Sequence, residues 1–427
     1  MTPAVISLII LAVCIVLFIT RVIPNAVTAC LGCLLFALTG VCTFEKAFSG
    51  FSNSTLLLMF GMMVVGIAMM DTGVARIIGR YVSKVSGGNE RFFILLAGLA
   101  SIILSTFLSN TAVISIFLPI ISSVVQSNQK MNRKNLTLPV TMGAMFGGVC
   151  TLVGSTPQLT ADGILYETTG IHLGMFDFLL PGLVVCGVYL LYVLTIGHRI
   201  GCHVWGEEVI ADDSVTDSAP ATQEETDAPV NKIRIAIMLS IFAFTVVMFI
   251  GGWISTAMTA VIAAILCIST KCTSWKTVVK KMDWSVVFIL AGCLGIAAGL
   301  TSGGAGELMS EVLSYVLNPD INPIIIFAIF VFATMLISNF ITNSTAVVIV
   351  LPIALACCSS MSLNPVTFTL GVVYAANLTF STPLANAQTA MTLVAGYKFS
   401  DYIRYTWLLD ILVYLAIVIS VPLFFPL

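Results

Sequence analysis

Charged residues are scarce in this chain of 427 residues: only 9% are Asp, Glu, Lys or Arg, whereas 59% are hydrophobic. A water-soluble fold cannot bury that much apolar surface, so the composition predicts an all-α polytopic membrane protein in contact with membrane lipid. The formal net charge of −2 offers no basic surface, which argues against nucleic acid as a partner.

Three kinds of functional site are also missing. No G-x-x-x-x-G-K-[ST] motif occurs, so nothing supports ATP-driven pumping, and no nucleophile–base arrangement indicates an enzyme. The 12 Cys are scattered without metal-ligand spacing, and we interpret them as small hydrophobic residues. We therefore expect no enzymatic activity and no cofactor. The first apolar run lacks a basic segment and a cleavage site, which indicates a retained span rather than a signal peptide.

What the chain does contain is one motif twice, 233 positions apart. The first copy reads FLSNTAVISIFLP and ends at Pro119, and the second reads FITNSTAVVIVLP and ends at Pro352. Asn110 and Asn343 occupy the same position in the two copies. Polar groups inside apolar sequence are costly in a membrane and mark a functional site by default. Their duplication is typical of transporters built from two structural repeats.

Apolar runs predict about ten full membrane spans. They cover residues 4–20, 24–42, 55–72, 137–160, 179–198, 233–250, 253–269, 285–300, 365–390 and 406–425. Two further apolar stretches, 92–125 and 323–358, carry the duplicated motif near their centres. Each is long for one span, and we predict that both are re-entrant hairpins with the polar triplet at the turn.

Basic residues set the predicted orientation. Arg91 and Lys130 flank the first hairpin, so it should enter from the cytoplasm, where basic loops stay. No Lys or Arg lies between Lys281 and Lys398, so the second hairpin should enter from outside. Five complete spans separate the two hairpins, and an odd number inverts the second repeat. This topology puts both chain ends outside the cell and the protein in the plasma (inner) membrane.

The predicted organisation follows from these repeats. Residues 1–200 would form the first inverted repeat and residues 232–427 the second. Between them, residues 201–231 hold eight acidic residues and no Lys or Arg, which predicts a solvated cytoplasmic linker.

Each repeat also has a polar break downstream of its triplet. The breaks run from Gly154 to Gln158 and from Ser381 to Asn386, and each contains a Pro that bends a helix and frees backbone carbonyls. Freed carbonyls bind cations and half-helix N-termini bind anions. Because neither hairpin contains Asp, Glu, His, Lys or Arg, Ser, Thr and Asn oxygens should hold Na⁺ rather than carry a proton. The pattern predicts two cation sites and one shared anion site.

At these residues the chain resembles the divalent anion/sodium symporter family, on the Ser109-Asn110-Thr111 signature and its permuted copy Thr342-Asn343-Ser344. The resemblance implies a sodium-coupled symporter of a dicarboxylate, citrate or sulfate that works as a homodimer by an elevator-type motion. The implied sodium ligands at one site are Ser105, Ser109, Asn110 and the backbone of Gly154. At the other site they are Ser338, Asn343 and the backbone near Ile341 and Ser381. The implied substrate-binding residues are Asn110, Thr111, Ser155, Thr156, Asn343, Ser344, Thr382 and Pro383.

Alternatives stay open at this point. A sodium-independent anion exchanger would share the same architecture. A cation/proton antiporter, or an arsenite- or citrate-type permease, would need a buried acid, for which Asp162, Asp71 and Asp410 are the candidates. Asp410 could instead pair with Arg404. The span-end acids Asp71 and Asp283 are expected to be solvated or to cap helices. A structural role, in which the triplets merely join helices, explains a single triplet better than a matched pair.

Overall fold

The computed structural model describes residues 2–20, 22–86, 89–127, 131–205, 232–316, 321–383 and 386–427. None of these residues lies in a β-strand, and helices account for most of them, as the apolar composition predicts. In the first half the helices are α1 (Pro3–Thr20), α2 (Asn25–Leu38), α3 (Phe44–Ala47), α4 (Ser54–Thr72), α5 (Val74–Val85), α6 (Glu90–Ser105), α7 (Asn110–Ser127), α8 (Arg133–Gly148), α9 (Thr156–Thr169), α10 (Leu179–Tyr192) and α11 (His198–Trp205).

The second half contains the helices α12 (Lys232–Gly251), α13 (Thr256–Ser269), α14 (Trp275–Lys281), α15 (Trp284–Ser302), α16 (Ala305–Val316), α17 (Pro323–Ser338), α18 (Asn343–Met361), α19 (Pro365–Asn377), α20 (Ala387–Met391) and α21 (Phe399–Phe424). Their order repeats that of the first half. The 233-residue offset carries residues 90 and 110, where α6 and α7 begin, onto residues 323 and 343, where α17 and α18 begin.

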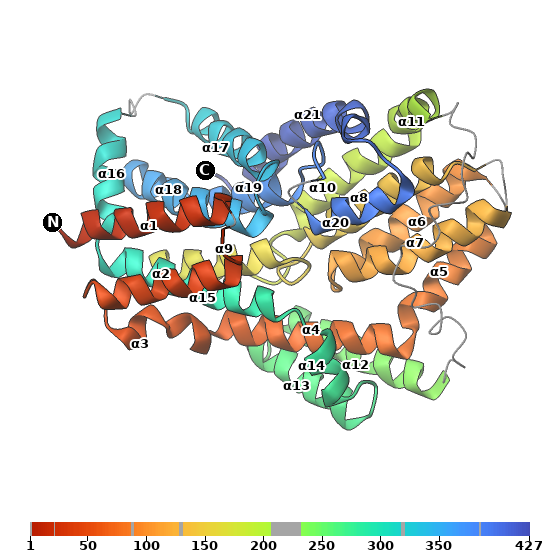
Figure 1. The fold of residues 1–427 in the computed structure, drawn as a ribbon, viewed down its shortest axis with the longest axis horizontal. Coiled ribbons are helices and arrows are strands. Elements are labelled where there is room, and N and C mark those ends of the chain that lie inside the picture. The colour runs from red at the N-terminus through yellow and green to blue at the C-terminus, as the bar shows by residue number, and fades with distance from the viewer. Residues whose placement is uncertain are drawn as a thin grey trace.

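Both predicted hairpins are helix pairs, and in each the polar triplet spans the last residue of the turn and the start of the second helix. α6 and α7 are separated by residues 106–109, and α17 and α18 by residues 339–342. Ser109 caps the start of α7, because its Oγ accepts the N–H of Ala112 at 3.4 Å. The matched prolines, Pro119 and Pro352, lie inside α7 and α18. Figure 1 shows α6 and α7 at one end of the long axis, and α17 and α18 at the other.

Both predicted breaks also interrupt helices. α8 ends at Gly148 and α9 begins at Thr156 with Pro157 in its first turn, where proline costs no hydrogen bond. α19 ends at Asn377, and α20 begins only at Ala387. Leu384 and Ala385, inside the second predicted break, lie outside the described residues. At both breaks, backbone groups therefore lack helical hydrogen-bond partners. The breaks and the hairpin tips lie near the middle of the molecule (Figure 1).

The predicted spans agree with the structure in type and only partly in length. Seven helices of the described chain are long and apolar enough to cross a membrane: α1, α4, α10 continued through Val193–Gly197 into α11, α12, α15, α18 and α21. Six coincide with predicted spans, and α18 is one arm of the second hairpin. α2 and α13 have only 14 residues each, and the runs 137–160 and 365–390 are broken helices. Seven described helices thus reach the length of a full span, and the total of about ten spans, which counts the two broken helices, stays a prediction.

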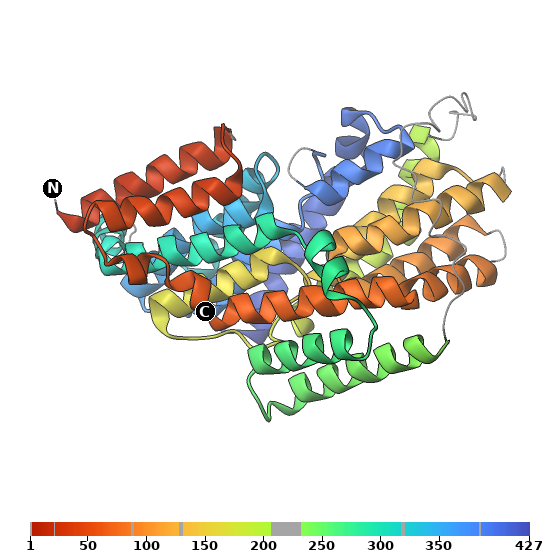
Figure 2. The ribbon, with the colours of Figure 1, turned by 60° about the horizontal axis from the view of Figure 1, so that its bottom comes forward.

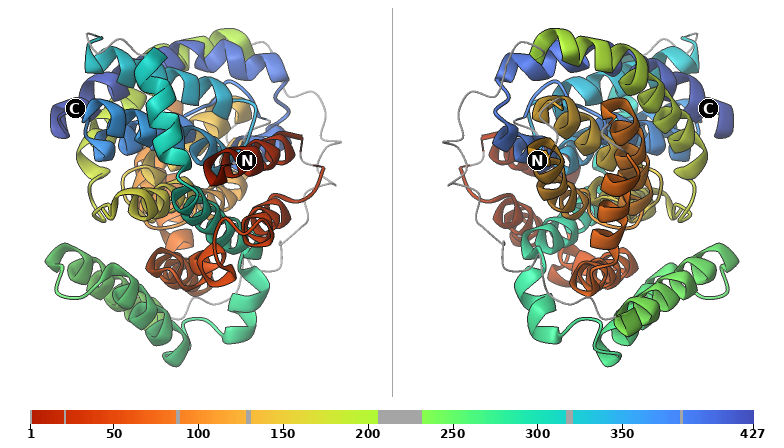
Figure 3. Two further views of the ribbon diagram at one scale, coloured as in Figure 1. Left: turned by 90° about the vertical axis from the view of Figure 1, so that its left-hand side faces the viewer. Right: turned by 90° about the vertical axis from the view of Figure 1, so that its right-hand side faces the viewer.

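Helices α12 and α13 form a pair on the outside of the molecule and lie against α4 (Figure 2). The N-terminus lies at the end that faces the viewer in the left panel of Figure 3. The hairpin of α17 and α18 lies at this end as well (Figure 1). The inversion of the repeats and the side of the membrane on which each end lies stay predictions.

The predicted linker, residues 201–231, begins too early, because α11 continues to residue 205. Residues 201–205 belong to α11, because the helix continues to Trp205, whose side chain is buried. Only residues 206–231 of the predicted linker separate α11 from α12, and they lie outside the described residues. The division into two repeats with this linker between them stays a prediction.

Candidate functional site

One cavity of about 680 Å³ contains both asparagines of the duplicated motif. It lies between the two hairpin tips, the first break and helices α4 and α15. The predicted site residues that line it are Ser109, Asn110, Thr111, Gly154, Ser155, Thr156, Asn343 and Ser344. Residues 233 positions apart in the sequence thus meet at one site.

The helices whose first residues line this cavity include those that begin at the two hairpin tips and at the first break. α7 begins at Asn110, α9 at Thr156 and α18 at Asn343, and all three residues line the wall. The first turn of a helix has unpaired N–H groups and a partial positive charge. Three of them converging on one cavity provide a site for negative charge without a fixed cationic side chain.

Oxygen atoms cluster where α6 and α8 end. Ser105 Oγ donates to Asn110 Oδ1 at 2.6 Å, and both residues are buried. A Cβ atom at Gly148 would lie 2.2 Å from Asn110 Oδ1, and one at Gly154 would lie 2.2 Å from the Gly148 carbonyl oxygen. Only glycine permits these two approaches. Four of the predicted ligands of the first sodium site, Ser105, Ser109, Asn110 and Gly154, thus lie at one hairpin tip and the break beside it.

An amide side chain fills the first break. Gln158 is fully buried and donates from Nε2 to the Gly148 carbonyl oxygen at 2.6 Å. Ser155 Oγ donates to Asn377 Oδ1 at 2.9 Å, which ties the first break to the end of α19. Asn377 also lines the cavity. The sequence analysis did not single it out, because an Asn within an apolar run has no motif of its own.

The second hairpin repeats the same contact. Ser338 Oγ donates to Asn343 Oδ1 at 3.2 Å, as Ser105 does to Asn110, and to the Ala376 carbonyl oxygen at 2.6 Å. The turn residue Ile341 is buried beside them. Two oxygen clusters therefore occupy matching positions at the two hairpin tips.

Two predicted substrate-binding residues of the second break, Thr382 and Pro383, are buried and do not line the cavity. Thr382 Oγ1 donates to the Asn339 carbonyl oxygen. Ser381 Oγ donates to Asp410 Oδ2, and the implied role of the Ser381 backbone at the second sodium site stays a prediction. The Thr-Pro pairs match in sequence, but α20 begins farther downstream of its Thr-Pro than α9 does. The cavity is consequently lined by Asn386, Ala387 and Gln388 at that position.

Few charges reach the cavity. Lys281 lines it, and its Nζ lies 2.7 Å from Asp71 Oδ1, while Thr273 Oγ1 donates to Asp71 Oδ2 at 2.6 Å. Asp283 also lines it, but Oδ1 accepts the N–H groups of Ser285 and Val286 and caps α15. The prediction of capping is thereby confirmed for Asp283, whereas Asp71 forms an ion pair across the fold.

Methionines form the apolar wall of the cavity, and the sequence analysis did not anticipate them. They all come from α4, which crosses beside the two hairpin tips. These residues are Met59, Met62, Met63 and Met70. Their spacing of three, four and seven positions is that of one helix face, which a core helix shows equally, so the sequence carries no signal for the role.

Asp162 is fully engaged by hydrogen-bond donors. It is buried, and its carboxyl accepts from Thr55 Oγ1 at 2.9 Å, from the Leu173 N–H at 2.7 Å and from His172 Nδ1 at 3.2 Å. The hydrogen bond with Asp162 raises the pKa of His172 against the lowering effect of burial. Asp162 does not line the cavity; it fastens the loop after α9 to the start of α4.

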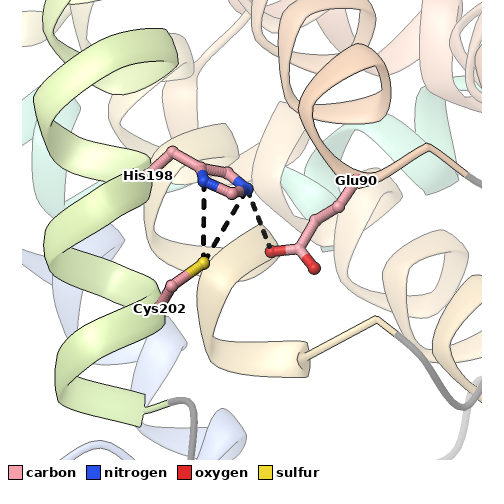
Figure 4. Close-up of side chains that lie close together, drawn as sticks. All are labelled: Glu90, His198 and Cys202. Carbon is pink, nitrogen blue, oxygen red and sulfur yellow. Dashed lines mark hydrogen bonds and ion pairs between the residues drawn. The ribbon is translucent and has the colours of Figure 1, made fainter.

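A second group of ligating side chains lies away from the cavity. Glu90, His198 and Cys202 offer atoms within 4.8 Å of one another, where α6 and α11 begin (Figure 4). His198 Nε2 lies 3.8 Å from Glu90 Oε1, and Cys202 Sγ lies 3.6 Å from His198 Nδ1. Arg91 Nε, however, donates to the same Nδ1 at 3.3 Å, and its positive charge opposes a metal ion there. We interpret the group as a polar contact between the two helices.

The all-helical fold and the cavity between two hairpin tips define a multi-pass membrane transporter. A family model described as "Citrate transporter" matches residues 15–342, and the chain belongs to that family. An uncharacterized transporter of Haemophilus influenzae is 23% identical over 430 residues, 95% of this chain and 88% of that protein. The sodium-dependent dicarboxylate transporter SdcS of Staphylococcus aureus is 22% identical over 410 residues, 89% of this chain and 78% of SdcS.

Two solved structures have the same fold. The YdaH transporter of Alcanivorax borkumensis superposes with a TM-score of 0.65 at 14% identity, covering 91% of this chain and 87% of that one. MtrF of Neisseria gonorrhoeae superposes with a TM-score of 0.62 at 11% identity, covering 99% and 94%. Together with the family match, these findings confirm the predicted family resemblance, an all-helical transporter fold and a multi-pass protein of the plasma (inner) membrane.

Proposed function

We propose that this protein is a secondary active transporter that couples the import of a small divalent anion, a dicarboxylate, citrate or sulfate, to Na⁺. The observation that carries the proposal is the single cavity that joins two matching oxygen clusters to three helix N-termini. The name of SdcS, a sodium-dependent dicarboxylate transporter similar over most of this chain, supports the same substrate class and coupling ion.

The anion would bind in the middle of the cavity. Helix N-termini and the amides of Asn110 and Asn343 provide N–H groups for carboxylate or sulfate oxygens. Lys281 adds a positive charge at the wall, partly offset by Asp71. The methionine wall offers apolar contact for the methylene groups of a dicarboxylate. A cavity of this volume is within the usual range for a small-molecule site.

Sodium would bind behind the two hairpin tips. At each tip a Ser hydroxyl and an Asn amide oxygen lie beside a helix C-terminus, where carbonyl oxygens and a partial negative charge favour a cation. The oxygen cluster at the first tip contains no carboxylate. A Na⁺ bound there would therefore contribute net positive charge next to the anion cavity, which explains why each ligand would favour the binding of the other.

We also propose that the protein works by alternating access with an elevator-type motion, as a homodimer. The elevator-type motion and the homodimer are implied by the family resemblance. The two hairpins and the two broken helices surround the cavity from both ends of the long axis (Figure 1), so they would have to move together with the bound anion.

Thermal stability of the purified protein tests the proposal. The panel would be sulfate, succinate, malate, citrate, aspartate and arsenite, each in Na⁺ and in K⁺ or choline. We expect one anion to raise the Tm only when Na⁺ is present, which establishes linked binding and identifies the anion. Stabilisation regardless of the cation would support an exchanger instead. Uptake into proteoliposomes that ignores an imposed Na⁺ gradient would refute sodium coupling.

A further inference from the structure

An acid on α21 contacts the second break. Asp410 lies in α21, a helix of membrane-spanning length, and its Oδ2 accepts a hydrogen bond from Ser381 Oγ. Its Oδ1 is enclosed and has no hydrogen-bond partner among the described residues. In the first half, α10 (Leu179–Tyr192) contains no Asp, Glu, Lys, Arg or His. Asp410 therefore gives the second break a carboxyl contact that α10 does not supply to the first.

Two hydroxyls accompany the carboxyl. Thr406 lies one helical turn before Asp410 on α21, and its Oγ1 is 3.3 Å from Ser381 Oγ. The next residue, Thr382, donates to the carbonyl oxygen of Asn339 in the turn of the second hairpin. Asp410 is thus connected through two adjacent residues to the hairpin tip that carries Asn343.

No positive charge neutralises this carboxyl within the described part of the chain. The ion pairs there do not include Asp410, and Arg404 on the same helix is exposed, so the alternative pairing with Arg404 is wrong. α17, α18 and α19 contain no Asp, Glu, His, Lys or Arg. From α10, Tyr192 faces Asp410, and its hydroxyl donates to the Tyr405 carbonyl oxygen.

A carboxylate enclosed at membrane depth is unfavourable unless a cation or a proton joins it. Carboxylate and hydroxyl oxygens next to unwound backbone form the kind of site that holds coupling ions in transporters. We propose that Asp410, Ser381 and Thr406 form the charged part of the second cation site, and that Na⁺ binds to the Asp410 carboxylate there. This inference rests on the proposed sodium-coupled function.

This assignment predicts that the two cation sites carry different net charges when Na⁺ is bound. Na⁺ at the second site would be neutralised by Asp410, whereas Na⁺ at the first site, among Ser105, Asn110 and Gly154, would keep its full charge. The first ion would then contribute most of the attraction for the anion. The second would chiefly fix the arrangement of hairpin tip, break and α21.

The test compares Asp410→Asn with wild type in proteoliposomes and in purified form. We expect the Na⁺ concentration for half-maximal uptake to rise at least about tenfold in D410N. We also expect the Na⁺-dependent gain in Tm to shrink, while stability in Na⁺-free buffer is retained because a buried charge has been removed. Asp177→Asn, in the loop before α10, is the matched control and should behave like wild type.

Other outcomes overturn the inference. An unchanged half-saturating Na⁺ concentration in D410N would do so, as would equal destabilisation with and without Na⁺, which indicates a structural role. Loss of pH dependence with unchanged Na⁺ dependence would identify a proton carrier instead. If D410N does not fold, Ser381→Ala and Thr406→Ala give the same readout while keeping the carboxyl. Wild-type uptake that ignores Na⁺ would refute the proposed function itself, whereas Na⁺-dependent wild type with an unaffected D410N refutes only this inference.

Discussion

Gly148 approaches Asn110 so closely that a Cβ atom at position 148 would lie 2.2 Å from Asn110 Oδ1 and 2.8 Å from Nδ2. The end of α8 and the tip of the first hairpin thus share a contact that tolerates no side chain. The carbonyl oxygen of Gly148, the last residue of α8, accepts a hydrogen bond from the Gln158 side-chain amide. One backbone position therefore fixes the hairpin tip, the broken helix and the predicted first sodium site relative to one another.

Gly148→Ala should displace the Asn110 side chain and reduce transport strongly. Overpacking of this kind costs about 1–3 kcal/mol, and the displaced amide would also lose its contact with Ser105. Uptake and Tm would be measured beside Gly187→Ala, a helix position where an added Cβ meets nothing within 4 Å. Normal uptake by G148A would contradict the first-site assignment.

Asn110→Ala and Asn343→Ala should each reduce uptake at least about tenfold, because each removes an amide from the cavity and an oxygen from a predicted sodium site. Size-exclusion chromatography would show that the folded protein persists. Asn322→Ala is the control, since Asn322 caps the N-terminus of α17 and the loss of this cap costs only about 1 kcal/mol of stability. Near-normal uptake in either variant would remove that asparagine from the site.

Lys281→Met should weaken the apparent anion affinity while leaving the maximal rate nearly unchanged. Lys281 lines the cavity but is partly exposed and paired with Asp71, so its contribution is small, about 1 kcal/mol or up to about fivefold in KM. Lys280→Met removes a neighbouring charge that does not line the cavity. Equal effects of the two substitutions would indicate a general surface potential rather than a role for Lys281 in the cavity.

The contact between His172 and Asp162 predicts a pH-dependent contribution to stability. The hydrogen bond with Asp162 raises the folded-state pKa of His172 above its ordinary value of 6.5. The protonated imidazole therefore stabilises the fold, fully below about pH 6.5 and progressively less as the pH rises through the raised pKa. The Tm difference between wild type and His172→Gln should shrink from pH 5 to pH 9. A difference independent of pH, or the same trend in His203→Gln, would refute this assignment.

Some features were predictable because they depend on local sequence. Apolar length sets the helices, and a polar triplet in the middle of 92–125 and of 323–358 allowed both hairpins to be predicted from the pattern alone. Helix ends were less predictable. The predicted linker began at residue 201 because polar residues follow, but burial of Trp205 extends α11 to that residue.

The sequence alone determined the membrane environment, the two hairpins, the two breaks and the pairing of Asn110 with Asn343. These follow from hydropathy and spacing, which act along the chain. Only the tertiary structure decided which residues share the cavity, because packing brings together α4, α15 and the two tips. It placed Asn377, Lys281 and the methionines on the cavity wall and buried Thr382 and Pro383 away from that wall. It also brought Ser381 into hydrogen-bonding contact with Asp410. A side chain's partner across the fold depends on distances between helices, and no periodicity within one helix encodes them.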